Sequence, residues 1–416
     1  SHPGPALHAE SGLALHQAMF SQYLRQRERD GWTVVFHELH PVPLYAPSDE
    51  LKAFFDQPTQ DHLLWVALEE RKLIVSSAEE DDAEWHVVRE RVLHELSRPK
   101  ILYLLLAQGC NFACHYCPVP RLAAQYGDQR LTAEDAEAGL DIWEKHLQDD
   151  SGVASYILFY GGEPLLNKPT FFLTLDAIAT RRLDGRFPAD GIQLLLITNG
   201  VLVDDEVIAA CLKHDVLVAV GLDGPKAAHD ALRVYADGRG SYDDVLAALR
   251  RLHDAGVRTA VSASITPGTL NHLKELKDIL RHVGVKKLGL NFLKGQALVE
   301  LVHPAELDAF ERAAVQAARE RQGGEDYQVE KKVTAFKTRE FYPVDCTCYG
   351  NQLVVRGDGS LSNCPFYNAE LGHVRSVGSD FRVSKTEVVE AWRQRHPLFN
   401  PAFRGNDAKA LCGPGC

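Results

Sequence analysis

The sequence Gln108-Gly-Cys-Asn-Phe-Ala-Cys-His-Tyr-Cys-Pro118 follows directly after an apolar run at residues 101–107. Its three thiols have the spacing Cys-x3-Cys-x2-Cys and belong to Cys110, Cys114 and Cys117. Because a four-iron, four-sulfur cube prefers four cysteine ligands, three thiolates hold three irons and leave the fourth iron open to another molecule. Structural zinc is the alternative, since zinc takes four nitrogen or sulfur ligands and His115 is a candidate fourth.

Six short apolar runs alternate with stretches of helical periodicity over the middle of the chain. The apolar runs lie at residues 101–107, 156–160, 192–198, 216–222, 259–265 and 287–293. The helical stretches lie at residues 132–148, 168–180, 204–214, 241–255 and 271–282. Apolar strands that alternate with helices predict a parallel α/β sheet buried on both faces. Six strand–helix units predict a partial (β/α)6 TIM-like barrel, because a full barrel has eight.

We place this barrel at residues 96–300, and two smaller regions flank it. Residues 1–95 predict a small N-terminal α+β module, with helical stretches at 13–29, 48–55, 63–68 and 83–96 and an apolar run at 71–75. Residues 301–416 predict a linker helix at 303–321 and then a Cys-rich C-terminal extension. A hairpin signal, Gly357-Asp-Gly-Ser360, lies within that extension.

The composition is that of an ordinary globular chain of 416 residues, with 45% hydrophobic and 25% charged residues. A net charge of -12 argues against a nucleic-acid partner, which requires a basic face. No apolar run reaches the roughly 18–20 residues of a membrane span, and no signal-peptide pattern opens the sequence. We therefore expect a cytoplasmic protein without a membrane partner, in which nine cysteines indicate metal binding rather than disulfides. Cys211, isolated within a helical stretch, is expected to be a small buried apolar residue instead.

The cysteine spacing, with Tyr116 just before the third thiol, resembles that of the radical S-adenosylmethionine (SAM) enzymes. The segment Gly161-Gly162-Glu163-Pro164 resembles the GGEP motif of the same superfamily. The resemblance implies that SAM binds the open iron through its amino and carboxylate groups and is cleaved to a 5'-deoxyadenosyl radical. It also implies that Gly162 and Glu163 bind the methionine amino group. A plain Gly-Gly turn with an exposed acid is the alternative for this segment.

A longer match covers residues 222–233 and 240–243, which resemble anaerobic sulfatase-maturating enzymes and radical SAM peptide maturases. The resemblance implies that Asp223 and Arg233 belong to the SAM site, with Arg233 paired to the SAM carboxylate. A guanidinium suits a planar acid, although a surface ion pair is the alternative. The family often has serine two residues before the aspartate, where this chain has Gly221. A side-chain contact to SAM is therefore absent at that position.

Polar residues at three further strands resemble positions that meet the nucleoside of SAM. Thr198-Asn199-Gly200 resembles the segment that meets the ribose, although Asn-Gly is also an ordinary turn. The resemblance implies contacts to adenosine from Ser262, Ser264 and Asn291. The two serines share one face of a strand because side chains alternate with period two. All three are equally interpretable as satisfied polar groups of the core.

The C-terminal cysteines resemble a SPASM or twitch extension, which ligates auxiliary iron–sulfur clusters. Two patterns carry this resemblance, Cys348-x10-Gly-x4-Cys364 and Cys412-x3-Cys416. Phe403 and Asn406 stand where a full SPASM domain has two more cysteines, so the resemblance implies one auxiliary cluster. Its ligands would be Cys346, Cys348, Cys364 and Cys416, or a set in which Cys412 replaces Cys346 or Cys348. A zinc knuckle is the alternative.

Together these resemblances imply a radical SAM enzyme that modifies a ribosomally made precursor peptide. The N-terminal module resembles the leader-binding regions of such enzymes, and residues 73–75 are a candidate sheet edge for an added peptide strand. Flavodoxin or ferredoxin is the expected electron donor. The reaction stays open between crosslinking and epimerisation. An anaerobic sulfatase-maturating enzyme and a non-catalytic zinc scaffold remain as alternatives.

Overall fold

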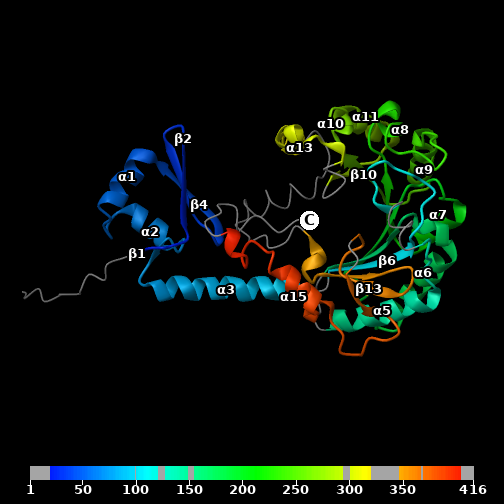
Figure 1. Cartoon of the computed structure of the whole chain (residues 1–416), viewed down its shortest axis with the longest axis horizontal. Coiled ribbons are helices and arrows are strands. Elements are labelled where there is room, and N and C mark those ends of the chain that lie inside the picture. The colour runs from blue at the N-terminus through cyan, green and yellow to red at the C-terminus, as the bar shows by residue number, and fades with distance from the viewer. Residues whose placement is uncertain are drawn as a thin grey trace, which may run out of the picture.

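One curved sheet organises most of the protein (Figure 1). The structure is a computed structural model and describes residues 19–98, 100–119, 127–148, 154–293, 300–319, 346–366 and 369–403. Within them the main sheet has the strand order β11-β10-β9-β8-β7-β6-β12-β13-β14. Its parallel part comprises β6 (Ile101–Ala107), β7 (Ser155–Gly161), β8 (Ile192–Thr198), β9 (Val216–Gly221), β10 (Thr259–Ile265) and β11 (Lys287–Phe292). This confirms the predicted partial barrel and its six apolar strands.

Amphipathic helices cover the outer side of these strands (Figure 1). They are α5 (Ala133–Gln148), α6 (Lys168–Leu183), α7 (Asp205–Lys213), α9 (Tyr242–Asp254) and α11 (Leu273–Val283). The other helices of this part are the short α8 (Lys226–Asp230) and α10 (Pro267–Leu270), and α13 (Leu307–Arg319), which contacts α10. Single 3-10 turns are η1 (Pro164–Asn167), η2 (Pro304–Glu306), η3 (Thr347–Tyr349), η4 (Val383–Lys385) and η5 (Pro401–Phe403). Large side chains such as Trp143, Phe159 and Phe171 are fully buried between helices and sheet, and form the core.

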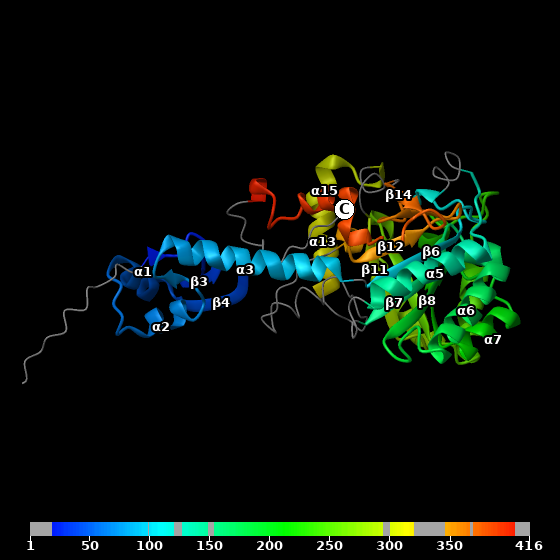
Figure 2. The ribbon, with the colours of Figure 1, turned by 90° about the horizontal axis from the view of Figure 1, so that it is seen from below.

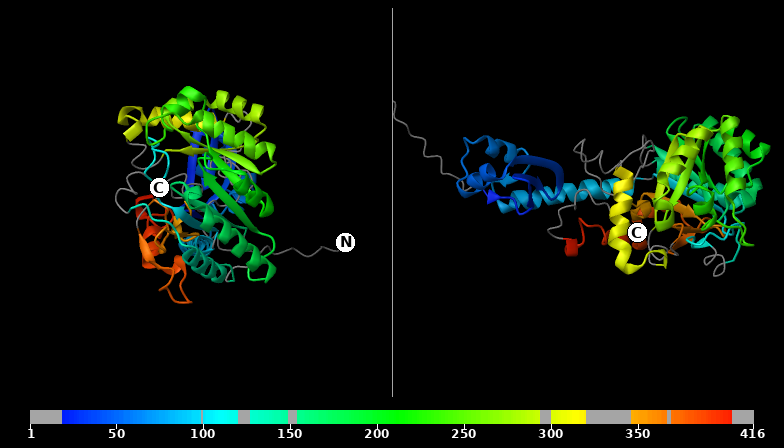
Figure 3. Two further views of the ribbon diagram at one scale, coloured as in Figure 1. Left: turned by 90° about the vertical axis from the view of Figure 1, so that its right-hand side faces the viewer. Right: turned by 90° about the horizontal axis from the view of Figure 1, so that it is seen from above.

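The C-terminal extension continues the barrel sheet, which sequence reasoning did not predict. Its strands are β12 (Gln352–Val355), β13 (Ser360–Ser362) and β14 (Glu370–His373). Strand β12 lies parallel to β6, with Gln352 opposite Ile101. Strands β12 and β13 form the antiparallel hairpin that the Gly-Asp-Gly-Ser signal predicts. In Figure 3 these strands lie against the barrel, so the extension shares its core.

The N-terminal module contains a three-stranded antiparallel sheet and two short helices. These are β2 (Leu24–Arg29), β3 (Trp32–His37), β4 (His40–Pro47), α1 (Ser48–Asp56) and α2 (Leu63–Glu69). A second pairing joins β1 (Met19–Phe20) to β5 (Ile74–Val75). The helix predicted at residues 13–29 is wrong from residue 19 onward, and residues 13–18 lie outside the described part. Asp30 (φ 53) and Gly31 (φ 78) form a tight hairpin turn that pairs β2 with β3.

A long helix, α3 (Ala78–Ser97), connects the module to the barrel (Figure 2). It begins where the Ser77 side chain accepts a hydrogen bond from the Glu80 amide, five residues earlier than the sequence predicts. Its last turns pack on Tyr349 and on residues that follow α15 (Glu387–Arg393). Across the described residues no helix is both long and apolar enough to cross a membrane.

Candidate active site

The cysteine loop lies at the carboxyl end of β6, where a parallel barrel places its chemistry. Backbone hydrogen bonds hold it against the segment after α8: the Ala113 amide donates to the Val234 carbonyl at 2.8 Å, and the His115 amide to the Leu232 carbonyl at 2.9 Å. The thiols of Cys110, Cys114 and Cys117 are all free, and all are buried or half-buried. The chain therefore presents three sulfur donors from one ordered loop.

Burial keeps these thiols protonated while no metal is bound. It raises the pKa of Cys110 to about 12 and that of Cys114 to about 11. Two local groups oppose this: the Phe112 amide donates to the Cys110 sulfur at 3.4 Å, and the Arg233 guanidinium lowers the pKa of Cys114. Metal binding needs thiolates, so these donors favour the ligating form. The donor set fits a soft iron–sulfur cluster.

A single metal ion needs a different arrangement of ligands from an iron–sulfur cube, because several side chains must converge on one point. No three His, Cys, Asp or Glu side chains within the described ranges converge on a point that would hold one ion. In a cube each ligating iron takes its own thiolate, so the sulfur ligands stand apart.

The two glycines after β7 bring its end against the end of β6. A Cβ on Gly161 would clash with the Ala107 carbonyl, and a Cβ on Gly162 would lie 2.6 Å from the Gly109 carbonyl carbon. Gly161 also has φ 140, which disfavours a side chain. The Glu163 amide donates to the Gly109 carbonyl at 2.9 Å. The close approach is therefore between two protein backbones, and it fixes the cysteine loop beside the GGEP segment.

Glu163 is fully buried and ties together the ends of β7 and β8. Its carboxylate accepts hydrogen bonds from the Thr198 hydroxyl at 2.7 Å, the Asn199 amide at 2.8 Å and the Leu165 amide at 3.0 Å. Burial raises the pKa of Glu163 and these donors oppose the rise. The Asn199 side chain in turn donates to Asn111 at 2.7 Å, within the cysteine loop. The Glu163 carboxylate is therefore occupied by donors of the protein itself. Pro164 begins the turn η1, and the Glu163 side chain caps that turn.

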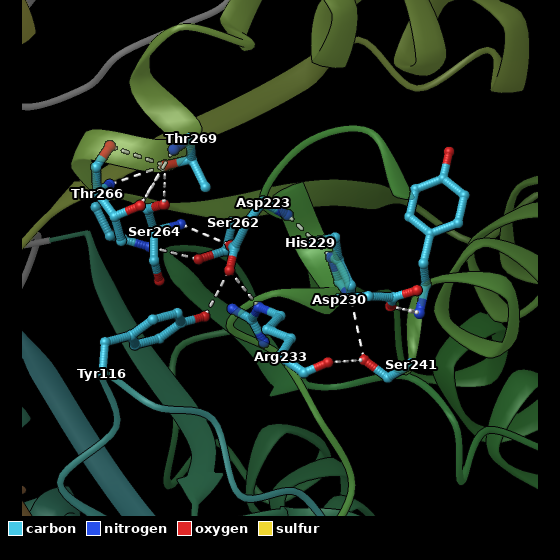
Figure 4. Close-up of polar contacts among 12 residues, drawn as sticks. Tyr116, Asp223, His229, Asp230, Arg233, Ser241, Ser262, Ser264, Thr266 and Thr269 are labelled. Carbon is cyan, nitrogen blue, oxygen red and sulfur yellow. Dashed lines mark hydrogen bonds and ion pairs between the residues drawn. The ribbon is translucent and has the colours of Figure 1, made fainter. Parts of the chain in front are cut away.

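Asp223 is the centre of a second buried network (Figure 4). One carboxylate oxygen accepts from the Tyr116 hydroxyl at 2.6 Å and from Arg233 Nε at 2.7 Å. The other accepts from the Ser264 amide at 2.8 Å. The network joins the cysteine loop, the end of β9, the segment after α8 and strand β10. Asp223 and Arg233 thus lie at the predicted site, as an ion pair that is buried rather than on the surface.

His229 and Ser241 connect to this network through further hydrogen bonds, and sequence reasoning missed both. His229 Nδ1 accepts from the Asp223 amide at 3.3 Å, so its proton is on Nε2, which faces the Ser241 hydroxyl at 3.0 Å. Ser241 donates onward to the Arg233 carbonyl at 2.9 Å. Burial, followed by the charge of Arg233, lowers the pKa of His229 to about 4, so the ring is neutral. The available signal was their place inside the matched stretches 222–233 and 240–243.

The predicted adenosine residues share a face but not a degree of burial. Ser262 and Ser264 are half-buried and alternate with buried neighbours on β10. Asn291, on β11, is exposed and donates to the Ser262 hydroxyl at 2.5 Å. Both serines lie close to Asp223 in Figure 4.

Three C-terminal cysteines form a second cluster of thiols. Cys348 makes hydrogen-bonding contacts with Cys346 and Cys364, and these contacts raise its pKa more than burial does. The Gln352 side chain donates to the Cys348 sulfur at 3.1 Å, and the Phe366 amide to the Cys364 sulfur at 3.4 Å. Cys412, Cys416 and Asn406 lie outside the described residues, and Phe403 ends η5. Cys211 is buried in α7, as expected.

Tyr160, the residue before the GGEP segment, is within electrostatic reach of thiols from both sets of cysteines. Burial raises its pKa, and the thiols of Cys117, Cys110 and Cys364 add to the rise because they lie within electrostatic reach. Its ring makes an edge contact with Phe366, at 6.0 Å between centroids. Sequence reasoning missed this residue, although its place just before the motif was a usable signal.

The barrel that carries this site is similar to known proteins. Residues 104–283 match the Radical SAM superfamily, and this part of the chain is a radical SAM domain. Domains of this enzyme superfamily use a [4Fe-4S] cluster and SAM. The chain is 26% identical over 204 residues to a serine-type anaerobic sulfatase-maturating enzyme of Klebsiella pneumoniae, covering 48% of each protein. It is 25% identical over 202 residues to the radical SAM cyclopropyl synthase TigE of Paramaledivibacter caminithermalis, covering 46% of this chain and 41% of TigE. The chain thus spans about half or less of these relatives.

Two solved structures show the same fold. The structure titled native anSMEcpe with bound AdoMet and Cp18Cys peptide aligns with TM-score 0.60 at 20% identity, covering 76% of this chain and 89% of that one. Streptococcus suis SuiB bound to precursor peptide SuiA aligns with TM-score 0.51 at 15% identity, covering 96% and 95%. The first confirms the partial barrel. The second extends over nearly the whole chain and so takes in the N-terminal module.

Proposed function

We propose that this chain cleaves SAM reductively and uses the resulting radical to modify a ribosomally made peptide. The observation that carries the first half is the juxtaposition of the three-cysteine loop with the Tyr116–Asp223–Arg233 network, inside a radical SAM domain. The second half is supported by the N-terminal module and by similarity in fold to two proteins whose structures hold a bound peptide.

Cys110, Cys114 and Cys117 hold the radical-forming cluster in this proposal. When bound, that cluster supplies the electron that cleaves SAM. Arg233 orients the SAM carboxylate with its terminal amino groups, because a guanidinium pairs bidentately with a planar acid. Asp223 holds Arg233 and Tyr116 in place, since its oxygens already accept bonds from the protein.

The remaining SAM contacts come from the ends of the other strands. The GGEP backbone meets the amino group, and the end of β8 meets the ribose. The proposed set is Gly161, Gly162, Glu163, Pro164, Thr198, Asn199, Ser262, Ser264 and Asn291. The fourth iron is left for SAM itself, because the loop offers three thiols.

One auxiliary iron–sulfur cluster completes the cofactor set. Cys346, Cys348, Cys364 and Cys416 would supply the four thiolates, or Cys412 would replace Cys346 or Cys348. The contacts of Cys348 with its two neighbours support this assignment.

We assign the precursor peptide's leader to the N-terminal module, and retain the division into residues 1–95, 96–300 and 301–416. Trp32 and Tyr45 support this role. They are diagonal neighbours on one face of the sheet and are 56% and 59% exposed. Exposed aromatic side chains on a small sheet are typical of a binding surface. An extended leader would add its backbone to an open strand edge. Flavodoxin or ferredoxin would supply the electron.

Formylglycine formation on a sulfatase is the second candidate, because several relatives are named as anaerobic sulfatase-maturating enzymes. Phe403, where the full extension has a cysteine, counts against it. The two functions differ in substrate and not in the SAM chemistry. A short peptide gene beside this one would favour the first, and a sulfatase gene the second.

Anaerobic purification tests the proposal. We expect a brown protein with about eight irons, and deoxyadenosine when SAM and dithionite are added. Mass spectrometry of a co-expressed precursor peptide should then show a modified core, whereas a sulfatase-derived peptide should stay unchanged. A colourless zinc protein that forms no deoxyadenosine would refute the enzymatic function. Modification of the sulfatase peptide alone would refute the peptide assignment.

A further inference from the structure

Gly221, the last residue of β9, lies directly beneath the guanidinium of Arg233. A Cβ on Gly221 would lie 2.6 Å from Arg233 Cζ and 2.7 Å from Nη2, and closer still to Nη1. These distances are shorter than any normal contact of a Cβ atom. The guanidinium therefore lies across the space that any other residue at position 221 would fill with its side chain.

Neighbouring groups hold the guanidinium in this space. Arg233 Nε donates to the buried Asp223, and the Arg233 Cζ lies 5.6 Å from the centre of the Tyr116 ring. The Arg233 backbone is fixed as well, since its amide donates to the His229 carbonyl at 2.8 Å. Only 13% of the side chain is exposed.

The two terminal amino groups of Arg233 differ from Nε in their hydrogen bonding. Among the described residues neither Nη1 nor Nη2 donates a hydrogen bond, although Nε does. Neither is among the fully buried side-chain atoms that lack a hydrogen-bond partner in the described part of the chain. The fork is therefore presented with its donors available for a planar acid.

We propose that Gly221 is a positioning residue of the SAM site, and that its missing side chain creates the place in which Arg233 lies ready for the SAM carboxylate. This inference rests on the proposed function. In the family that the sequence resembles, this position often carries a serine. This chain would instead place a guanidinium over a bare strand end.

Space, and not backbone conformation, is what requires glycine here. The φ angle of Gly221 is outside the left-handed region that favours glycine. Glycine inside a strand weakens it, so without a steric role alanine would be preferred. Gly289 on β11 provides a matched control, because the nearest atom to a Cβ there is the Val261 carbonyl oxygen at 3.9 Å. That distance is an ordinary contact.

The test compares Gly221→Ala, Gly221→Ser and Gly289→Ala in the full-length protein reconstituted anaerobically. The atoms displaced at position 221 belong to the end of a side chain and not to the backbone, so the variants should still fold. Equilibrium dialysis with SAM should give a dissociation constant raised at least about tenfold in both Gly221 variants. Gly289→Ala should bind SAM as the wild type does.

A double-mutant cycle separates positioning from general damage. If Gly221 acts only through Arg233, then Gly221→Ala added to Arg233→Ala should weaken SAM binding no further. Unchanged SAM affinity in Gly221→Ala, or penalties that multiply in the double variant, would overturn the inference. In both cases the proposed function would stand, because the wild type would still bind and cleave SAM. A wild type that binds no SAM would overturn both.

Discussion

The strand ends of the barrel and the junction between α3 and the C-terminal extension are built from different kinds of contact. At the strand ends, hydrogen bonds join the segments that follow the parallel strands to one another, such as Glu163 after β7 to Asn199 after β8. At the junction, Arg393 donates to the Leu96 carbonyl across 297 positions of sequence. Asn351 likewise caps the end of α3 through the Arg98 carbonyl at 2.9 Å.

This difference separates two roles. The strand ends form a closed network of polar groups around the cysteine loop, so the barrel holds every residue that we assign to SAM. The junction connects the N-terminal module to the extension that carries Cys346, Cys348 and Cys364. Changes at the strand ends should therefore abolish SAM cleavage, and changes in the module or extension should leave cleavage intact but uncouple it from the peptide.

The largest effect is expected from replacing Cys110, Cys114 and Cys117 together by Ala. Deoxyadenosine formation with dithionite should fall at least about a thousandfold, a barrier change of about 4 kcal/mol. Iron bound by the C-terminal cysteines should remain. Cys211→Ala, a buried cysteine outside both sets, is the control and should retain activity. Deoxyadenosine from the triple variant would show that another site cleaves SAM.

The next effect concerns the buried ion pair. Asp223→Ala leaves Arg233 without its buried partner, and such a loss typically destabilises a protein by about 3 kcal/mol. Denaturant unfolding measures this change. Asp176→Ala removes the exposed partner of Lys213 and should cost less than about 1 kcal/mol. Equal costs for the two variants would contradict the special status of the Asp223 network.

Cys364→Ala tests the auxiliary set. A cluster that loses one of four thiolates is destabilised, so iron content should fall and peptide product should drop at least about tenfold. Deoxyadenosine formation in the absence of peptide should persist. If both activities fall together, the two sets of cysteines are not functionally separate.

A variant that lacks the N-terminal module should be truncated before α3 and not within it. Val88 and Val92 pack against Tyr349, so a later cut would expose the core of the junction. A chain that begins at Ala78 should lose leader affinity by about tenfold or more and keep uncoupled SAM cleavage. The double variant Trp32→Ala and Tyr45→Ala should reproduce the loss. Unchanged affinity with a lower melting temperature would make the module structural.

The smallest effect is a pH dependence of the unfolding free energy. One buried histidine in the module and one in the barrel should each contribute to it. Burial lowers the pKa of His37 in the module to about 3 and that of His229 in the barrel to about 4. The unfolded chain therefore takes up these protons first as the pH falls below about 6.5. Each histidine should reduce the unfolding free energy by up to about 1.4 kcal/mol per pH unit. His37→Gln should flatten the slope measured between about pH 6 and about pH 5.

Local patterns explain why most of the barrel is predictable. The apolar runs at β6 and β9 match the observed strands because a strand buried on both faces requires uninterrupted apolar residues. The motifs then fall at strand ends because parallel strands all end on one side. In the module, residues 19–29 have good helix formers but pair as strands, since the Asp30-Gly31 turn outweighs local propensity.

The sequence by itself determined the radical SAM domain, its cysteine loop and the places of Glu163, Asp223 and Arg233, because each depends on residues close in the chain. Only the tertiary structure decided that β12 pairs with β6, that the end of α3 packs against the C-terminal extension, and that Arg233 lies over Gly221. These pairings join segments that are separated in sequence, and no local pattern encodes them. They are selected by the burial of shared apolar surface and by the space that one missing side chain leaves.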